Sequence, residues 1–256
     1  MPDRLKNKVA VVTGSTSGIG EGIVRAFAAE GACVVVSGRR ADRGEAVATF
    51  IRQAGGQGVF QQADLTVPED CLRLIRRAVE AFGGLDVLVN NAGIFPRTKF
   101  EDTSVELWDA IFNTNIRGAF LCCQAAVPLM RQRGGGSIIN IGSLHPFLGG
   151  GDLMAYGVSK GALHCLTRKL GQVLAKDRIR VNWVSVGWVL TEMEYEVQAQ
   201  QGRDAKALDE TRARLPMGQF NTVEDIAAGC VYLASDDGVR VSGTDLNVTA
   251  GMGIRL

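Results

Sequence analysis

A tyrosine and a lysine four positions apart, Tyr156 and Lys160, are the strongest candidates for chemistry in this chain. In a helix they would lie on the same face, one turn from each other. A phenol has an ordinary pKa of ~10, and a neighbouring ammonium lowers it by stabilising the phenolate. A tyrosine whose pKa is shifted toward neutral pH can act as a general acid or base. The alternative is an exposed helix face with two unrelated side chains, and the rest of the chain decides between them.

A glycine-rich turn lies near the N-terminus, between a predicted strand at 9–12 and a predicted helix at 21–30. Glycines at such a turn let backbone N–H groups approach a phosphate, which the positive end of the helix also attracts. A tight structural turn without a ligand is the alternative interpretation. From this turn we expect cofactor contacts by Gly14, Ser15, Ser17, Gly18, Ile19 and Gly20.

The second predicted strand, at 33–36, is followed by the residues SGRR, with no carboxylate before Asp42. A carboxylate at the strand end would bind the ribose 2′-hydroxyl of NAD, whereas an arginine accommodates the 2′-phosphate of NADP. A guanidinium pairs with phosphate through charge-assisted hydrogen bonds. Arg39 therefore favours NADP(H) as the cofactor. Alternatively, Arg39 and Arg40 are solvated residues at the start of the next helix, and the cofactor is then NAD(H).

The composition excludes several classes of partner. The chain has 256 residues, of which 46% are hydrophobic, and a formal net charge of +1. This balance gives no field that would attract nucleic acid or an anionic membrane. The cysteines have no C-x-x-C spacing, so we expect free thiols in a reducing compartment and no metal site. The sequence has no signal core or membrane-spanning run, and we expect a cytoplasmic protein.

Short apolar runs alternate with amphipathic segments along the chain. Strands are predicted at 9–12, 33–36, 58–62, 85–89, 137–141, 179–185 and within 239–248. Helices are predicted at 21–30, 41–54, 68–82, 104–133 with a break at 113–115, from the loop at 149–151 to about 175, and at 222–234. This alternation predicts a single α/β domain over residues 1–256, a doubly wound parallel sheet of Rossmann type with about seven strands and helices on both faces.

The segment 188–216 differs from the rest, because it is rich in Glu, Gln, Arg and Met and has weak periodicity. Connections of this length are usually lids or binding loops, so we expect it to cover the substrate. In a doubly wound sheet the ligands bind at the carboxyl ends of the strands. At such a strand end, Asp64 could bond an adenine amino group or cap the next helix. The positions expected at this edge are 14–20, 39, 64, 90–93, 143 and 187.

Together these motifs resemble the short-chain dehydrogenase/reductase family over nearly the whole chain. The residues TGSTSGIG at 13–20 are similar to the family's cofactor turn, and NNAG at 90–93 to its second signature. The resemblance implies the strand order 3-2-1-4-5-6-7 and is strongest toward 3-oxoacyl thioester reductases and sugar or ketone oxidoreductases. The family's catalytic order and its Ser-to-Tyr spacing are matched by Asn115, Ser143, Tyr156 and Lys160.

The resemblance also implies which residues hold a nicotinamide cofactor. Gly187 and Thr191 are similar to the segment that contacts the nicotinamide carboxamide. The chain departs from the family in having VG rather than PG at 186–187, TAG rather than DGG at 249–251, and Ser17 where some NADP-dependent members carry a basic residue. Beyond the glycine turn and Arg39, the implied cofactor residues are Asp64, Leu65, Asn91, Ala92, Gly93, Tyr156, Lys160, Gly187, Val189 and Thr191.

The resemblance implies a role for each catalytic residue. The substrate carbonyl oxygen would lie between Ser143, which stabilises the developing alkoxide, and Tyr156, which donates the proton. Lys160 would lower the pKa of Tyr156 and bond the nicotinamide ribose, and Asn115 would hold a water linked to solvent. We therefore expect an NADPH-dependent ketone or 3-oxoacyl reductase. The alternatives are an NAD-dependent sugar or polyol dehydrogenase and, remotely, a cofactor-binding protein without activity.

The expected substrate contacts are Ser143, Tyr156, His145 and Trp188. His145 could bond a polar substrate group or the backbone of its own loop. Trp188 favours an apolar or ring-shaped substrate, unless it packs within the lid. Other residues expected to line the pocket are Phe95, Phe147, Met193 and Tyr195.

The partners expected are a small-molecule carbonyl or alcohol and further copies of this chain. The resemblance implies a homotetramer assembled through the helices at 104–131 and 155–175, whose outer faces carry apolar residues.

Overall fold

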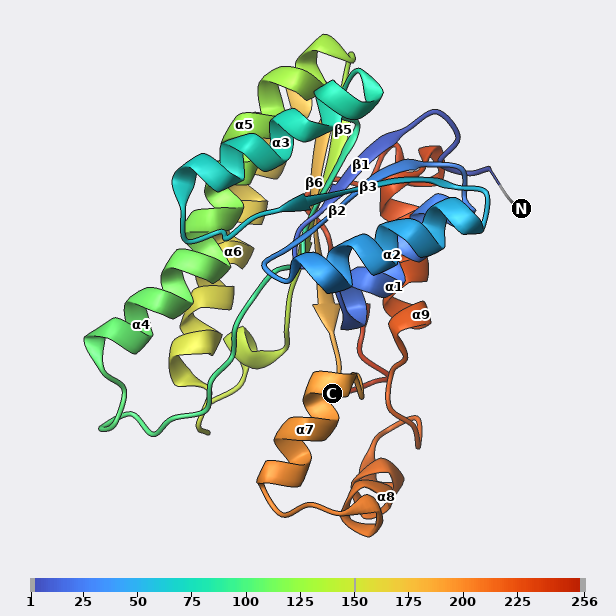
Figure 1. Cartoon of the computed structure of the whole chain (residues 1–256). Coiled ribbons are helices and arrows are strands. Elements are labelled where there is room, and N and C mark those ends of the chain that lie inside the picture. Colours follow the sequence, from blue (N-terminus) through green and yellow to red (C-terminus); the bar gives the residue numbers. More distant parts are fainter. Residues whose placement is uncertain (1–2, 150, 254–256) are drawn as a thin grey trace.

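In the computed structural model, which describes residues 3–149 and 151–253, seven strands form one parallel sheet (Figure 1). They are β1 (Val9–Val12), β2 (Cys33–Gly38), β3 (Gln57–Gln62), β4 (Val87–Asn90), β5 (Gly136–Ile141), β6 (Ile179–Val186) and β7 (Asp245–Val248). Their order, β3-β2-β1-β4-β5-β6-β7, confirms the predicted one. The chain reverses its direction of winding between β1 and β4, which opens a crevice at the carboxyl ends of these strands.

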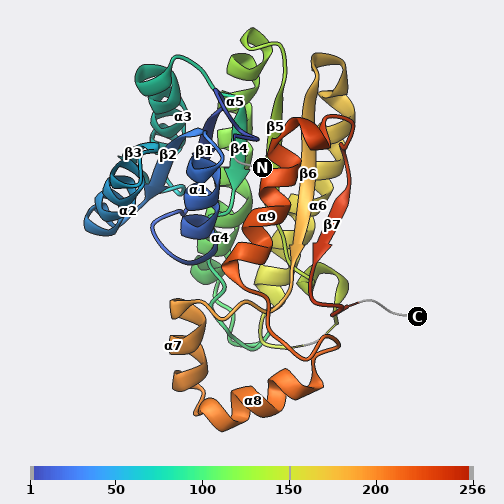
Figure 2. The same ribbon diagram turned by 90° about the vertical axis from the view of Figure 1, so that its right-hand side faces the viewer.

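Helices cover both faces of the sheet, as predicted (Figure 2). One face carries α1 (Gly18–Ala29), α2 (Ala41–Gln53) and α9 (Val223–Ala234), and the other carries α3 (Pro68–Phe82), α5 (Ala119–Gln132) and α6 (Met154–Val173). The inner strands are buried on both sides because alternate residues enter opposite cores. In β1, Ala10 and Val12 join one core, and Val9 and Val11 join the other.

The predicted helix at 104–133 is interrupted around Asn115, as expected. It consists of α4 (Val105–Phe112), a π-helical turn (Asn113–Gly118) and α5. Such π-helical turns often occur at functional sites. Asn115 is fully buried within this turn, so its amide is directed into the protein rather than toward solvent.

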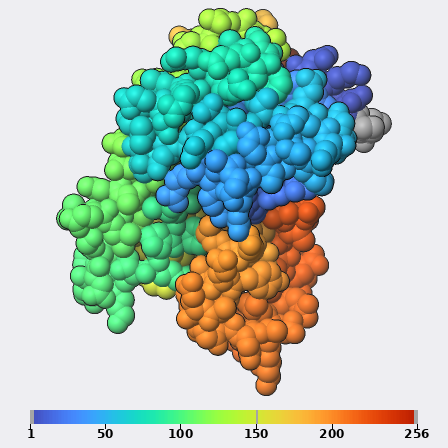
Figure 3. All heavy atoms as spheres, in the orientation of Figure 1, coloured from blue at the N-terminus to red at the C-terminus, as the bar shows by residue number. Residues whose placement is uncertain are grey.

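The segment 188–216 is more regular than its weak periodicity predicted, because it contains α7 (Glu192–Gln200) and α8 (Ala205–Arg214). The side chains of Thr191 and Asp204 accept hydrogen bonds from backbone N–H groups of the first helical turns and so cap the two helices. In Figure 3 this segment (orange) forms a lobe that projects from the body of the protein, beside α4 (green). Within residues 3–149 and 151–253, every helix is too short or too polar to span a bilayer.

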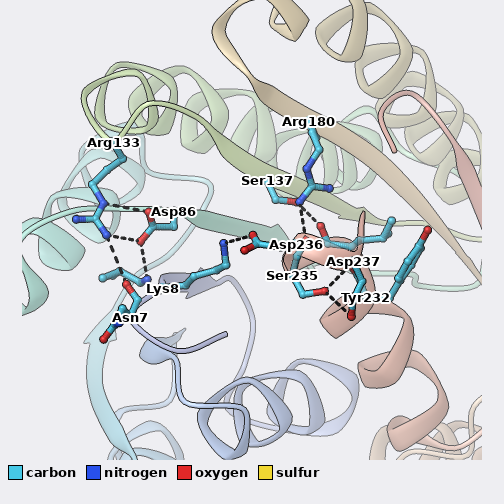
Figure 4. Close-up of polar contacts among 12 residues, drawn as sticks. Asn7, Lys8, Asp86, Arg133, Ser137, Arg180, Tyr232, Ser235, Asp236 and Asp237 are labelled. Atoms are coloured by element: carbon cyan, nitrogen blue, oxygen red, sulfur yellow. Dashed lines mark hydrogen bonds and ion pairs between the residues drawn. The ribbon is translucent and has the colours of Figure 1, made fainter. Parts of the chain in front are cut away.

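A polar network ties the amino-terminal ends of the strands together (Figure 4). Asp86 accepts a hydrogen bond from the first N–H of β1 at 2.8 Å and pairs with Arg133 at 3.0 Å. On β6, Arg180 donates to the carbonyls of Ser235 and Val241, in the turns that follow α9. These contacts lie at the edge opposite to the ligand crevice, and we interpret them as structural ties.

Candidate active site

A cavity of about 850 Å³ opens at the carboxyl edge of the sheet, and nearly all predicted site residues line it. Among the predicted catalytic and cofactor residues, Ser15 and Asn115 are the exceptions, because both are fully buried behind this lining. The loops after β1 to β6 therefore bring together residues that are far apart in the sequence. The predicted residues in the lining are Gly14, Ser17, Gly18, Ile19, Gly20, Arg39, Asp64, Leu65, Asn91, Ala92, Gly93, Ser143, His145, Tyr156, Lys160, Gly187, Trp188, Val189 and Thr191.

The glycine turn is held in shape by the end of β4. Gly14 has a φ of +63°, in the left-handed region that favours glycine. A Cβ atom on Gly20 would collide with the carbonyl oxygen of Gly14. Asn91 donates from Nδ2 to the carbonyls of Thr13 and Gly14, both at 3.0 Å, which fixes the turn before any ligand arrives. The bare backbone leaves room for a phosphate at the N-terminus of α1.

Ser15 serves this turn rather than the cavity. Its hydroxyl donates to the carbonyl of Val12 at 2.7 Å and accepts from the N–H of Ser37 at 2.9 Å. The side chain is satisfied within the protein, and the structure does not show the predicted contact of Ser15 with the cofactor cavity.

Arg39 and Asp64 form the part of the cavity next to β2 and β3. Burial acts to raise the pKa of Asp64, but two hydrogen bonds from Thr66 and the positive charge of Arg39 outweigh it, so the pKa is lowered. The bonds from Thr66 are 2.9 Å long from the backbone and 2.7 Å long from the hydroxyl, and both end on Oδ1. Asp64 is thus an ionised acceptor that suits an amino group, while the exposed Arg39 can approach an anion.

Arg40 also reaches this region, and sequence reasoning did not single it out. Its Nη2 donates to Ser17 Oγ at 2.8 Å and lies 3.4 Å from Thr16 Oγ1. Two guanidinium groups therefore border the cavity beside the glycine turn. The pair of arginines was visible in the sequence, but their directions depend on how α2 begins.

Tyr156 lies in the first turn of α6, with Phe95 and His145 around its ring at centroid distances of 5.9 and 5.8 Å. Burial raises the pKa of its phenol, and the nearby hydroxyl of Ser143 acts in the opposite direction. The predicted lowering of this pKa is therefore wrong for the protein without ligand. The reason is that desolvation disfavours the phenolate more than the neighbouring groups favour it. The phenol is protonated at neutral pH.

Lys160 lies one turn further along α6, as predicted. Its Nζ is 5.8 Å from the centroid of the Tyr156 ring and donates to the carbonyl of Ile141 at 2.8 Å. Desolvation lowers the pKa of this lysine from 10.5 to about 8. An ammonium has three N–H donors, and Ile141 is its one hydrogen-bond acceptor among residues 3–149 and 151–253. The other donors are available to a ligand.

Asn115 uses both ends of its amide within the protein. Its Oδ1 accepts from the N–H of Ile94 at 2.8 Å, and its Nδ2 donates to the carbonyl of Ile94 at 2.9 Å and to Ser159 Oγ at 3.0 Å. These contacts tie the loop after β4 to α6, immediately before Lys160. They give no support to the predicted water-holding role and indicate instead that Asn115 positions the two elements.

The substrate side of the cavity is lined by Phe95, His145, Trp188 and Met193, as predicted. Phe147 and Tyr195 do not line it, contrary to the prediction. Phe147 follows His145 in a short 3-10 turn, which directs its ring toward His164, with ring centroids 5.2 Å apart. Tyr195 lies on the exposed side of α7.

His145 presents a neutral imidazole to this side of the cavity. Burial and the positive charge of Arg97 lower its pKa, although the carboxylate of Asp152 acts against them. Its ring lies beside the ring of Tyr156, so a substrate at Tyr156 also meets His145. This placement agrees with the predicted substrate contact.

Trp188 is fixed by the lid. Its indole Nε1 donates to Glu194 Oε1 at 2.9 Å, and its ring packs against Phe220 with centroids 5.2 Å apart. Glu194 also lines the cavity, and sequence reasoning did not single it out. The pattern Thr191-x-x-Glu194 is typical of a helix N-terminus and could have identified both α7 and this residue.

The arrangement suits hydride transfer to or from a carbonyl carbon. A carbonyl oxygen placed between Tyr156 and Ser143 would meet two hydrogen-bond donors, which stabilise negative charge on it. The bare turn at Gly20 fits the phosphates of a dinucleotide, and Arg39 fits a further anion. The residues present therefore fit a nicotinamide dinucleotide next to a proton donor.

Comparison with known proteins gives matches over the whole fold. Residues 14–253 match a family model described as enoyl-(acyl carrier protein) reductase. The chain is 38% identical over 256 residues to the NADP-dependent (R)-specific alcohol dehydrogenase of Lentilactobacillus kefiri, with 98% of both chains covered. It is 35% identical over 256 residues to the D-beta-hydroxybutyrate dehydrogenase of Cupriavidus necator, with 96% of this chain and 98% of that protein covered.

A solved structure from Beutenbergia cavernae is also similar. That protein is assigned provisionally as an NAD(P)-dependent gluconate 5-dehydrogenase, and its structure contains NADP at low occupancy. It superposes with a TM-score of 0.90 and 35% sequence identity, and 98% of each chain is covered.

Proposed function

The chain belongs to the short-chain dehydrogenase/reductase family, and from that premise we propose that it is an NADP(H)-dependent oxidoreductase of ketones and secondary alcohols. The observation that carries the proposal is that Tyr156 and Ser143 line one cavity, together with Lys160 and the glycine turn. The names of the similar alcohol and hydroxybutyrate dehydrogenases support this reaction class.

In this mechanism the substrate oxygen lies between two donors. Ser143 donates a hydrogen bond to it, and Tyr156 transfers its proton to the oxygen as the alkoxide develops. The cofactor, when bound, supplies the hydride. Because burial keeps the phenol of Tyr156 protonated at neutral pH, the resting site suits the reductive direction. In the oxidative direction the phenolate accepts the alcohol proton, which alkaline pH favours.

The remaining residues of the cavity would hold the cofactor. Lys160 has N–H donors to offer to the nicotinamide ribose. Asn115 holds the loop after β4 against α6, the helix that carries Lys160. Arg39 and Arg40 would share the 2′-phosphate. Ser17 stands where some NADP-dependent members of the family carry a basic residue. Arg40 is placed to supply the missing positive charge, because its guanidinium donates a hydrogen bond to the Ser17 hydroxyl. NADP in the similar Beutenbergia cavernae structure supports this cofactor.

We further propose that the protein is a cytoplasmic homotetramer assembled through α5 and α6. The outer faces of these helices support this, since they expose the apolar side chains of Phe120, Val158 and Val173. Contact with other copies would remove this apolar surface from water.

The proposed function predicts turnover that depends on NADPH. Purified protein should oxidise NADPH in the presence of some members of a panel of ketones, 3-oxoacyl thioesters and sugars, and it should reduce NADP⁺ with the matching secondary alcohols. The measurement is nicotinamide absorbance with both cofactors. A clear preference for NADH with sugars or polyols would favour the NAD-dependent sugar dehydrogenase instead. Cofactor binding without turnover of any panel member would favour a protein without activity.

Removing the guanidinium of Arg39 should change the cofactor preference. In Arg39→Ala, kcat/KM for NADPH should fall by about 10- to 100-fold, because a charge-assisted bond to the 2′-phosphate is lost. The value for NADH should change little, since NADH lacks that phosphate. Arg43→Ala is the matched control, because the Arg43 guanidinium also lines the cavity but is paired with Glu192 at 2.8 Å. Equal losses with both cofactors would contradict the assignment.

A further inference from the structure

Glu194 places a buried carboxylate in the wall of the active-site cavity. It lies in the first turn of the lid helix α7 and is 8% exposed. The same cavity is lined by Tyr156 and Ser143. A carboxylate is costly to bury unless hydrogen bonds satisfy its oxygens, so its partners indicate what it does.

The two oxygens of Glu194 have different surroundings. Oε1 accepts from the indole Nε1 of Trp188 at 2.9 Å and from Nε2 of Gln198 at 2.7 Å. Oε2 accepts no hydrogen bond from the protein within residues 3–149 and 151–253. One oxygen is therefore anchored by two donors. The other has no protein donor and is not among the fully buried polar atoms, so it stays accessible on a residue that lines the cavity.

Structural roles do not use this second oxygen. Thr191 caps α7 by accepting from the N–H of Glu194, but in the described structure the Glu194 side chain does not return the bond that would complete a capping box. The nearby Arg203 donates to Oε1 of Gln198 at 3.3 Å rather than to the carboxylate. The anchoring of Oε1 instead fixes the direction in which Oε2 can accept.

We propose that Oε2 of Glu194 accepts a hydrogen bond from a hydroxyl or a protonated amine of the substrate, carried on a carbon other than the one that is oxidised or reduced. This rests on the proposed function, because it concerns the substrate of the same cavity. The substrates are then secondary alcohols with a second hydroxyl or an amino group, together with the corresponding ketones. An anionic group at this place would be repelled by the carboxylate, and an apolar group would leave Oε2 unsatisfied.

Matched alcohols test the proposal with NADP⁺. The first set is 2-butanol, 1,3-butanediol and 4-amino-2-butanol, and the second is 2-pentanol, 1,4-pentanediol and 5-amino-2-pentanol. Each set keeps the oxidised carbon and varies the distal group. In at least one set, a donor-bearing alcohol should have a kcat/KM about 10- to 100-fold above that of the plain alcohol. Preference for the diol identifies a hydroxyl as the donor, and preference for the amino alcohol identifies an ammonium.

Two variants then assign the preference to Glu194. Glu194→Gln keeps an oxygen for Trp188 and Gln198 but replaces the free acceptor by an NH₂ group, so the preference should fall to near the level of the plain alcohol. Glu196→Gln is the control, because Glu196 lines the same cavity, is exposed and gives the same change in charge. It should keep the wild-type preference. Circular dichroism and the thermal midpoint verify that both variants fold.

Binding separates failure of this inference from failure of the proposed function. The same alcohols are titrated calorimetrically into the complex of the protein with NADP⁺. Preferential binding of a donor-bearing alcohol that Glu194→Gln removes, without oxidation, would overturn the proposed reaction and support the Glu194 contact. Equal kcat/KM and affinity for all three alcohols of both sets, or a preference that Glu194→Gln keeps, would overturn the inference.

Discussion

The Tyr156→Phe variant should bind NADP(H) as the wild-type protein does and should turn over substrate at least about 10³-fold more slowly. The phenol hydroxyl is the proton donor to the substrate oxygen in the proposed mechanism, and phenylalanine lacks it. The ring itself should stay in place, because its neighbours Phe95 and His145 contact the ring. The measurement is kcat from nicotinamide absorbance, together with Kd for NADPH from cofactor fluorescence.

A matched control comes from the second donor of the same site. Ser143→Ala removes one hydrogen bond to the substrate oxygen but leaves the proton donor, so its loss in kcat should be smaller than that of Tyr156→Phe. Retention of kcat within tenfold in Tyr156→Phe would contradict the role of Tyr156. A parallel loss of NADPH binding would instead indicate a damaged fold.

The parts of the site that the sequence predicts are those fixed by local spacing. The glycine turn follows β1 directly, and Tyr156 and Lys160 share one helix, so their relative positions depend on a few neighbouring residues. The alternation of strands and helices limits the sheet to few topologies, and family resemblance selects the observed order. Because Ser143 follows β5 at the carboxyl edge of the sheet, the same topology also places Ser143 and Tyr156 in one cavity.

The parts that the sequence does not predict depend on packing between distant segments. Arg40 donates a hydrogen bond to Ser17, 23 residues earlier in the chain, and this contact depends on how the start of α2 packs beside the glycine turn. Glu194 is buried because the lid folds over the cavity, although its neighbours in α7 are mostly exposed. The sequence shows that a lysine lies near Tyr156, but it does not show how deeply Tyr156 is buried. The burial of Tyr156 decides the direction of its pKa shift.

Lys160→Met should give a protein that is nearly inactive and yet more stable than the wild type at neutral pH. Loss of the cation beside Tyr156 and the nicotinamide ribose should lower kcat/KM by about 10²-fold or more. Burying this ammonium is unfavourable, since desolvation lowers its pKa from 10.5 to about 8, which corresponds to roughly 3 kcal/mol. Methionine avoids this cost, and the lost bond to Ile141 offsets part of the gain.

The pH dependence of this gain identifies its cause. Below about pH 8 the lysine is charged in both the folded and the unfolded chain, so the full penalty is present. Between about 8 and 10.5 the folded protein has already released its proton, the unfolded chain binds more protons, and wild-type stability rises with pH. The difference in free energy of unfolding between Lys160→Met and wild type, measured by urea denaturation, should therefore be constant up to about pH 8 and shrink toward pH 10. Buried cysteines titrate in both proteins and cancel in this difference. A difference in free energy of unfolding that does not change with pH would mean that packing, rather than the buried charge, sets the stability of the variant. It would also mean that the Lys160 ammonium is hydrated in the folded protein.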